Sequence, residues 1–134
     1  MTTSTTRSAR KAAATGGLSP ANAVILRGVV SSAPRRRELP SGSVLDQLEV
    51  TTRWREGSVA TVPVAWFDPT TEFAADDEVV VIGHVRRRFF RAAGATVSRT
   101  EVVAERIVRA GRRRAVERAV AAALATLAGE LDGP

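Results

Sequence analysis

A dense cluster of cationic and aromatic side chains occupies residues 86–91, which read Arg-Arg-Arg-Phe-Phe-Arg. Guanidinium groups neutralise phosphates, and exposed aromatic rings let nucleic-acid bases stack, at on the order of 1–3 kcal/mol per base. Neighbouring side chains of a strand face opposite ways, so Phe89 and Phe90 cannot both point inward. The cluster therefore predicts a binding platform for single-stranded nucleic acid; one core phenylalanine and a solvated charged ribbon are the alternative. Its cationic members are Arg86, Arg87, Arg88 and Arg91.

The same pattern recurs at Trp54, which lies between Arg53 and Arg55. We predict that Trp54 stacks on bases while the two arginines contact phosphates. A tryptophan that closes one end of a barrel is the alternative. Further along, Trp66 and Phe67 place two aromatic rings on opposite faces of a strand.

The residue types needed for catalysis are scarce. The chain has no cysteine and a single histidine, His84, which excludes thiol nucleophiles, disulfides and multi-histidine metal sites. Three adjacent acids, Asp76, Asp77 and Glu78, lack the spacing of a calcium loop. We expect no enzyme activity, no cofactor and no metal.

Length and charge are typical of one basic binding domain. The 134 residues carry 20 cationic and 14 acidic side chains, for a net charge of +6, and 44% are hydrophobic. This is enough to bury one core, and no segment approaches the roughly 20 apolar residues that span a bilayer. Nineteen of the 20 cations are arginine, a skew that coding bias could produce, so the positions of the arginines count for more than their number.

Residues 1–20 contain no acid and almost no bulky apolar side chain. We expect a disordered basic arm there, with a short transit peptide as the alternative. The missing apolar core of a secretory signal favours an intracellular, cytoplasmic protein.

In the rest of the chain, apolar and polar residues first alternate with the period of two that is typical of strands, and later recur with the spacing of a helix. The expected strands span 22–30, 43–54, 59–67, 78–91 and 96–108. A short helix or turn is expected at 69–77, with Phe73 as a core residue, and an amphipathic helix at 112–131. Gly28 is a candidate for the bend that lets the first strand serve both halves of a barrel.

Five strands, a short helix between the third and fourth, and a C-terminal helix are the element order of an OB-fold barrel. We predict a mainly β protein with a basic arm at 1–20, an OB-fold domain at 21–110 and a C-terminal helix at 111–132. OB-folds carry binding loops after their first strand, and a loop is expected there that holds Arg35, Arg36 and Arg37. A solvated cluster of charges is the alternative.

The run Asn22-Ala-Val-Ile-Leu-Arg-Gly28, followed by Pro34 and Ser41-Gly42, resembles the first strand and loop of bacterial single-stranded DNA-binding proteins. Residues 79–90, then Gly94 and residues 99–104, are similar to that family's last two strands and their hairpin. The resemblance implies an OB-fold that binds single-stranded DNA without sequence preference, as a homotetramer in the bacterial nucleoid.

Carried over by position, the resemblance gives Trp54, Trp66 and Phe90 the role of stacking residues. Ala60 stands where the family has a further aromatic residue, and the chain lacks the family's acidic C-terminal tip. Recruitment of replication or repair enzymes through that tip is therefore not expected.

We expect sequence-independent binding and protection of single-stranded DNA during replication, recombination or repair. An RNA-binding OB module is one alternative, because OB grooves do not by themselves select the sugar. A protein-assembly module, in which the exposed aromatic residues form a subunit interface, is the other.

Overall fold

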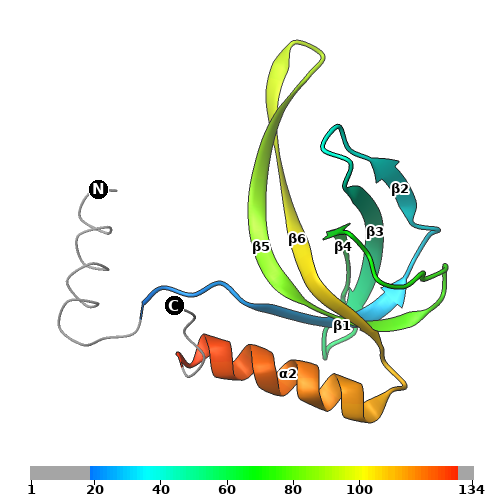
Figure 1. Cartoon of the computed structure of the whole chain (residues 1–134), viewed down its shortest axis with the longest axis vertical. Helices are drawn as coiled ribbons and strands as arrows, with labels where there is room; N and C mark the ends of the chain where they lie inside the picture. Colours follow the sequence, from blue (N-terminus) through cyan, green and yellow to red (C-terminus); the bar gives the residue numbers. More distant parts are fainter. Residues whose placement is uncertain (1–18, 130–134) are drawn as a thin grey trace.

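The computed structural model describes residues 19–129, so residues 1–18 of the expected arm lie outside the described residues. Six strands and one helix follow in order along the chain (Figure 1). They are β1 (Val24–Val30), β2 (Arg35–Glu38), β3 (Val44–Arg53), β4 (Val59–Phe67), β5 (Glu78–Ala92), β6 (Ala95–Arg109) and α2 (Arg113–Leu127).

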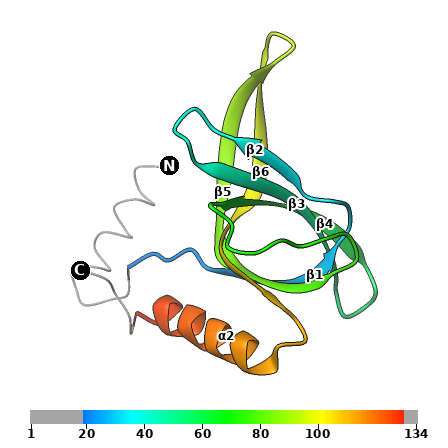
Figure 2. The same ribbon diagram turned by 45° about the vertical axis from the view of Figure 1, so that its right-hand side comes forward.

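Five of the strands close into a barrel. β1 pairs with β5, β5 with β6, β6 with β4, β4 with β3, and β3 again with β1. Every pairing is antiparallel except the parallel β4–β6 contact that joins the two halves. This is the OB-fold, mainly β with a C-terminal helix, and the predicted fold class is confirmed (Figure 2).

Two glycines permit the close strand crossings that barrel closure needs. Gly28 lies where β1 passes from β5 to β3, and a Cβ there would collide with the carbonyl oxygen of Thr51. Gly83 lies at the irregular register of β5 and β6, where a Cβ would collide with the carbonyl oxygen of Val103. Gly28 therefore has its expected role in the bend of the first strand.

The barrel is filled by β-branched and aromatic side chains. Val30, Val50 and Val81 are fully buried. Trp66 and Phe73 pack at one end, with ring centroids 5.8 Å apart, so Phe73 is the core residue that the sequence predicted.

Of the two alternatives expected at 69–77, a short helix or a turn, the structure has the turn. The segment consists of bends and turns, with Asp68 and Asp76 at positive φ values of 50° and 76°. The Asp77 carboxylate accepts a hydrogen bond from the Ala74 amide at 2.8 Å. Such side-chain bonds to the backbone stabilise a turn at the expense of a helix.

The expected loop at 35–37 contains strand β2, which pairs with β3. β2 reads Arg-Arg-Arg-Glu and lacks the alternation of apolar and polar residues that is typical of a strand. The sequence pattern therefore did not predict it.

Helix α2 packs on the outside of the barrel. Its Ala119 and Ala123 contact Val80 and Ile82 of β5. Among the described residues the helix ends at Leu127, short of the expected residue 131, because Gly129 takes a positive φ of 84°. No helix within residues 19–129 is long and apolar enough to cross a membrane.

Candidate nucleic-acid interface

The outer surface of β3 and β4 forms the floor of the candidate site. Strand alternation directs Gln47 and Glu49 of β3 outward, and their cross-strand partners Ala65 and Pro63 face the same way. A pocket of about 90 Å³ lies on this surface. Arg35 borders it from the start of β2, and Arg99 and Glu101 border it from β6. With Glu49 on the floor, two arginines and two glutamates line the pocket.

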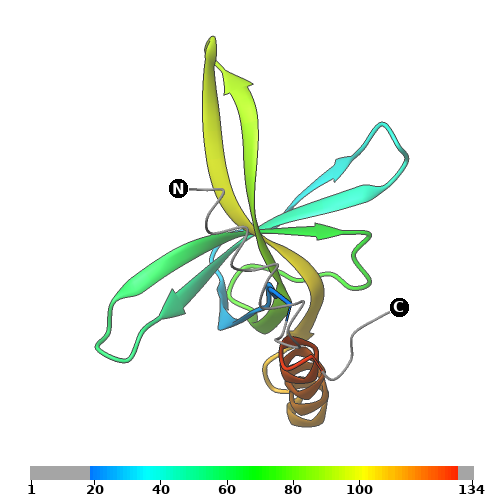
Figure 3. The same ribbon diagram turned by 90° about the vertical axis from the view of Figure 1, so that its left-hand side faces the viewer.

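The β5–β6 hairpin extends beyond the barrel (Figure 3). The two sides of the hairpin carry different side chains. Cross-strand pairs share a side, so one side holds the pairs Arg86–Glu101, Arg88–Arg99 and Phe90–Val97. The opposite side holds Arg87, Phe89 and Arg91, paired with Thr100, Ser98 and Thr96. The hairpin thus presents arginine and phenylalanine on both sides.

Buried and half-buried acids position the arginines of the first side. Glu101 is only 4% exposed, and Arg86 donates to its Oε2 from Nε at 2.9 Å and from Nη2 at 2.7 Å. Arg88 lies 3.5 Å from the same oxygen. On the same surface, Arg99 pairs with Glu49 at 3.4 Å. These contacts fix where the guanidinium groups stand and neutralise part of their charge.

We call this surface the arginine face. It consists of Arg35, Arg37, Arg86, Arg88 and Arg99, with the acids Glu49 and Glu101. Arg35 and Arg37 belong to it because they pair with Gln47 and Leu45, which lie on the same side of β3 as Glu49. Five cations against two acids leave it basic.

Arg36 points to the other side of β2, away from the arginine face. It donates two hydrogen bonds to the Asp46 carboxylate, at 2.8 and 2.9 Å. Those bonds and the charge of Asp46 raise the pKa of Arg36. The Arg36 guanidinium thus holds a buried carboxylate while its own side chain stays 49% exposed, and its contact with nucleic acid stays a prediction.

The two hairpin phenylalanines differ in what covers them. The Arg88 guanidinium lies over the Phe90 ring, 5.0 Å from its centroid. Phe89 is 64% exposed, so its ring is open to a ligand. The two rings point to opposite sides, as strand alternation predicts. Arg91 donates to the carbonyl of Gly94 at 3.0 Å, which holds it at the hairpin tip.

Trp54 lies at the β3–β4 turn and is 59% exposed, which rules out a barrel-closing role. The Arg55 guanidinium stacks on it, 4.8 Å from the ring centroid. Arg53 donates to the Gly57 carbonyl at 3.1 Å and so braces the turn. This turn and the β5–β6 hairpin project from the barrel in different directions (Figure 3). Because Trp54 belongs to the turn and Phe89 to the hairpin, the two rings stand at separate places on the surface.

Trp66 does not reach the surface. It is 4% exposed and packs on Phe73, so the prediction that it stacks on bases is wrong. Its neighbour Phe67 takes the outward position, where the Arg86 guanidinium lies 5.6 Å from the ring centroid.

Sequence reasoning missed three members of the arginine face, Glu49, Arg99 and the buried Glu101, and also Phe67, which lies beside Arg86. Arg99 and Glu101 could have been found from the expected hairpin. Pairing β5 with β6 and following every second residue places them opposite Arg88 and Arg86.

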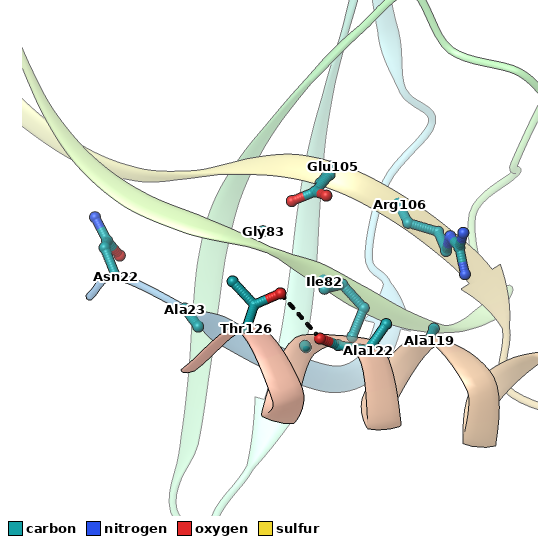
Figure 4. Close-up of a pocket in the computed structure, with 10 residues that line it drawn as sticks. Asn22, Ala23, Ile82, Gly83, Glu105, Arg106, Ala119, Ala122 and Thr126 are labelled. Carbon is teal, nitrogen blue, oxygen red and sulfur yellow. Dashed lines mark hydrogen bonds between the residues drawn. The ribbon is translucent and has the colours of Figure 1, made fainter. Parts of the chain in front are cut away.

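Elsewhere the structure offers little for catalysis. Within residues 19–129, no group of three or more His, Cys, Asp or Glu residues could hold a metal ion. A cavity of about 160 Å³ lies between α2 and the barrel, walled by Ala119, Ala122, Ala123 and the backbone at Gly83 (Figure 4). Thr126 at its edge donates to the Ala122 carbonyl at 3.0 Å, so its hydroxyl is already engaged.

The chain is an OB-fold domain, and one of its surfaces is basic. No family model matches the chain, and no curated protein matches it. Among solved structures, the chain is similar to the dimeric structure of the N-terminal domain of PriB protein from Thermoanaerobacter tencongensis. The TM-score is 0.54 at 14% identity, over 66% of this chain and 94% of that one. This likeness supports the fold; membership of the bacterial single-stranded DNA-binding protein family stays a prediction.

Proposed function

We propose that the protein binds single-stranded DNA without sequence preference, as a non-catalytic cytoplasmic protein of replication, recombination or repair. The observation that carries the proposal is the β5–β6 hairpin. Phe89 stands 64% exposed between Arg87 and Arg91 on one side, and the arginine face continues on the other.

The phosphate backbone would be held by the arginine face. Its guanidinium groups come from three strands, β2, β5 and β6, and border the surface of β3 and β4. A flexible single strand can follow such a surface, whereas a duplex is too stiff to do so. Because binding would release counterions from the phosphates, affinity falls as salt rises.

The bases would stack on the exposed rings. Phe89 and Trp54 are open on the surface, and stacking is tolerant of sequence because every base has an aromatic face. Since these rings stand at separate places, a strand that uses both must run across the barrel surface from the β5–β6 hairpin to the β3–β4 turn.

We also propose that the protein acts as a homo-oligomer. The PriB domain of similar fold is described as dimeric, and the resemblance noted in the sequence implies a tetramer. Several OB-folds together offer a longer basic path, and linked sites raise the overall affinity for one strand.

The test is a titration of the full chain with labelled oligo-dT, oligo-rU and duplex DNA, each at low and high salt. We expect dT to bind well above duplex and to weaken steeply with salt. Tighter binding of rU than dT would replace the proposal with the RNA-binding alternative. Equal, weak binding of all three would overturn it in favour of an assembly module.

Arg87→Ala provides the matched variant, with Arg114→Ala on α2 as its control. Both remove one exposed arginine, so they change the net charge equally. Loss of dT affinity in the first and not the second assigns binding to the hairpin; equal losses point to nonspecific attraction by net charge.

A further inference from the structure

Helix α2 packs on the barrel through small side chains and leaves its large ones outside. Ala119 and Ala123 are buried against β5, while Leu124 is 52% and Leu127 45% exposed. Val120 is half-buried beside them. An amphipathic helix that only covered its own barrel would do the reverse, burying its leucines. The exposed leucines therefore form a second apolar face with no partner among residues 19–129.

This second face continues onto the barrel. Ile25 of β1 pairs with Ile82 of β5 and shares its outward side; Ile82 lies under α2, while Ile25 stays exposed. β1 and α2 run side by side in Figures 1 and 2. We call Ile25, Val120, Leu124 and Leu127 the leucine patch. Contiguous apolar surface rimmed by charges marks an interaction site.

The spacing along the helix fits another helix. Val120, Leu124 and Leu127 are four and three residues apart, the alternation that places side chains along one seam between paired helices. Residues 1–18 offer no cover of this kind, because Met1 and Leu18 are their only large apolar side chains.

The charges on α2 favour an antiparallel copy. Its first two turns carry Arg113, Arg114 and Arg118 against the single acid Glu117. Antiparallel pairing keeps the two basic starts apart and aligns the helix dipoles favourably. Parallel pairing would bring the two basic starts together.

We propose that the leucine patch joins two copies of the chain, with α2 packed antiparallel against α2 about a two-fold axis. A self-complementary patch of this kind closes as a dimer. The proposal names the surface for the homo-oligomer proposed above and does not depend on nucleic-acid binding.

The first test is the mass of the full chain in solution by sedimentation, from low to high micromolar concentration and without nucleic acid. We expect a concentration-dependent dimer in the wild type, and a monomer in the double variant Leu124→Glu/Leu127→Glu. The control is Ala122→Glu, which adds one of these two charges on the opposite side of the helix from Leu124 and should leave the dimer intact. A wild-type monomer throughout, or a dimer unchanged in the double variant, overturns the proposal.

The second test fixes the orientation through charge. In the antiparallel pair the two Arg114 side chains lie at opposite ends of the interface, so Arg114→Glu leaves dimerisation unchanged. If the helices were parallel, Arg114→Glu would strengthen the dimer by removing repulsion. Because Arg114 is exposed on α2, this variant stays informative even if the leucine variant fails to fold.

Binding of oligo-dT by the same proteins separates this proposal from the proposed function. A dimer that binds no dT leaves the leucine patch standing and overturns the function. A monomeric wild type that binds dT does the opposite.

Discussion

Arg86 of β5 reaches across the hairpin to Glu101 of β6 and places two donors on a single carboxylate oxygen, at 2.7 and 2.9 Å. Glu101 is nearly inaccessible while Arg86 remains partly exposed, so the acid anchors the arginine from below. The same oxygen also contacts Arg88, whose guanidinium covers Phe90. One buried acid thus organises the basic side of the hairpin.

Glu101→Gln should move stability and DNA affinity in opposite directions. Losing charged hydrogen bonds from a buried acceptor costs about 1.5–3 kcal/mol of folding free energy. Removing a negative charge from the arginine face should tighten dT binding at low salt and steepen its salt dependence. Thermal melts and a salt series measure both effects, with Glu117→Gln on α2 as the control. A parallel loss of stability and affinity would contradict this account of Glu101.

Phe89→Ala should weaken dT binding more than Phe90→Ala does. A lost stack of about 1.4 kcal/mol is a tenfold loss in affinity. Phe90 is covered by Arg88, so its removal should chiefly disturb the packing of the hairpin. Anisotropy titrations of both variants, at matched helical and strand content by circular dichroism, measure this. A larger loss in Phe90→Ala would restore the stacking role that the family resemblance implies for it.

The two tryptophans should report on different parts of the molecule. Trp54→Phe should abolish the quenching of intrinsic fluorescence by dT, because only the exposed ring can meet a base. Trp66→Phe should keep the quenching, and Trp66→Ala should cost about 3–5 kcal/mol of stability by opening a cavity beside Phe73. Fluorescence titration and denaturant unfolding are the measurements. Quenching that survives in Trp54→Phe would show that the DNA path avoids the β3–β4 turn.

Asp77 should make folding sensitive to acid. The hydrogen bond from the Ala74 amide, followed by that from Arg109, lowers the pKa of Asp77 below its ordinary value of 3.8. Its contribution is therefore present above pH 3.8 and is lost as the pH falls through the lower folded-state pKa. Melting temperatures of wild type and Asp77→Asn should differ at neutral pH and converge in strong acid. A gap that stays constant down to the lowest pH would exclude the titration of Asp77 as its cause.

The strand pattern of the sequence was sufficient to predict the barrel, and the limits of that pattern explain the errors. Alternation places Trp66 and Phe67 on opposite faces, but which one points inward depends on the register of β4 against β3 and on Phe73. Neither the register nor the contact with Phe73 can be predicted from the residues next to Trp66 and Phe67 in the sequence.

The arginines show the same limit. The sequence does not distinguish Arg35, Arg36 and Arg37. Their roles differ only because Arg36 pairs with Asp46 of β3 and lies on the same side of the sheet. The turn at 69–77 depends on residues such as Asp76 at positive φ, which composition alone does not mark. The assignment of DNA-contacting residues among the remaining arginines stays a prediction.

The way the barrel closes has a consequence for the order of folding. The β5–β6 hairpin pairs residues that are close in sequence, from Ala92–Ala95 at its tip downward. Closure joins Val24 to Gly83 and so must bring distant parts of the chain together. Local hairpins form in microseconds, while non-local pairings slow folding. We expect the hairpin to be an early element and the docking of β1 to be the rate-limiting step, so that substitutions at Gly28 slow folding while substitutions at the hairpin tip leave its rate unchanged.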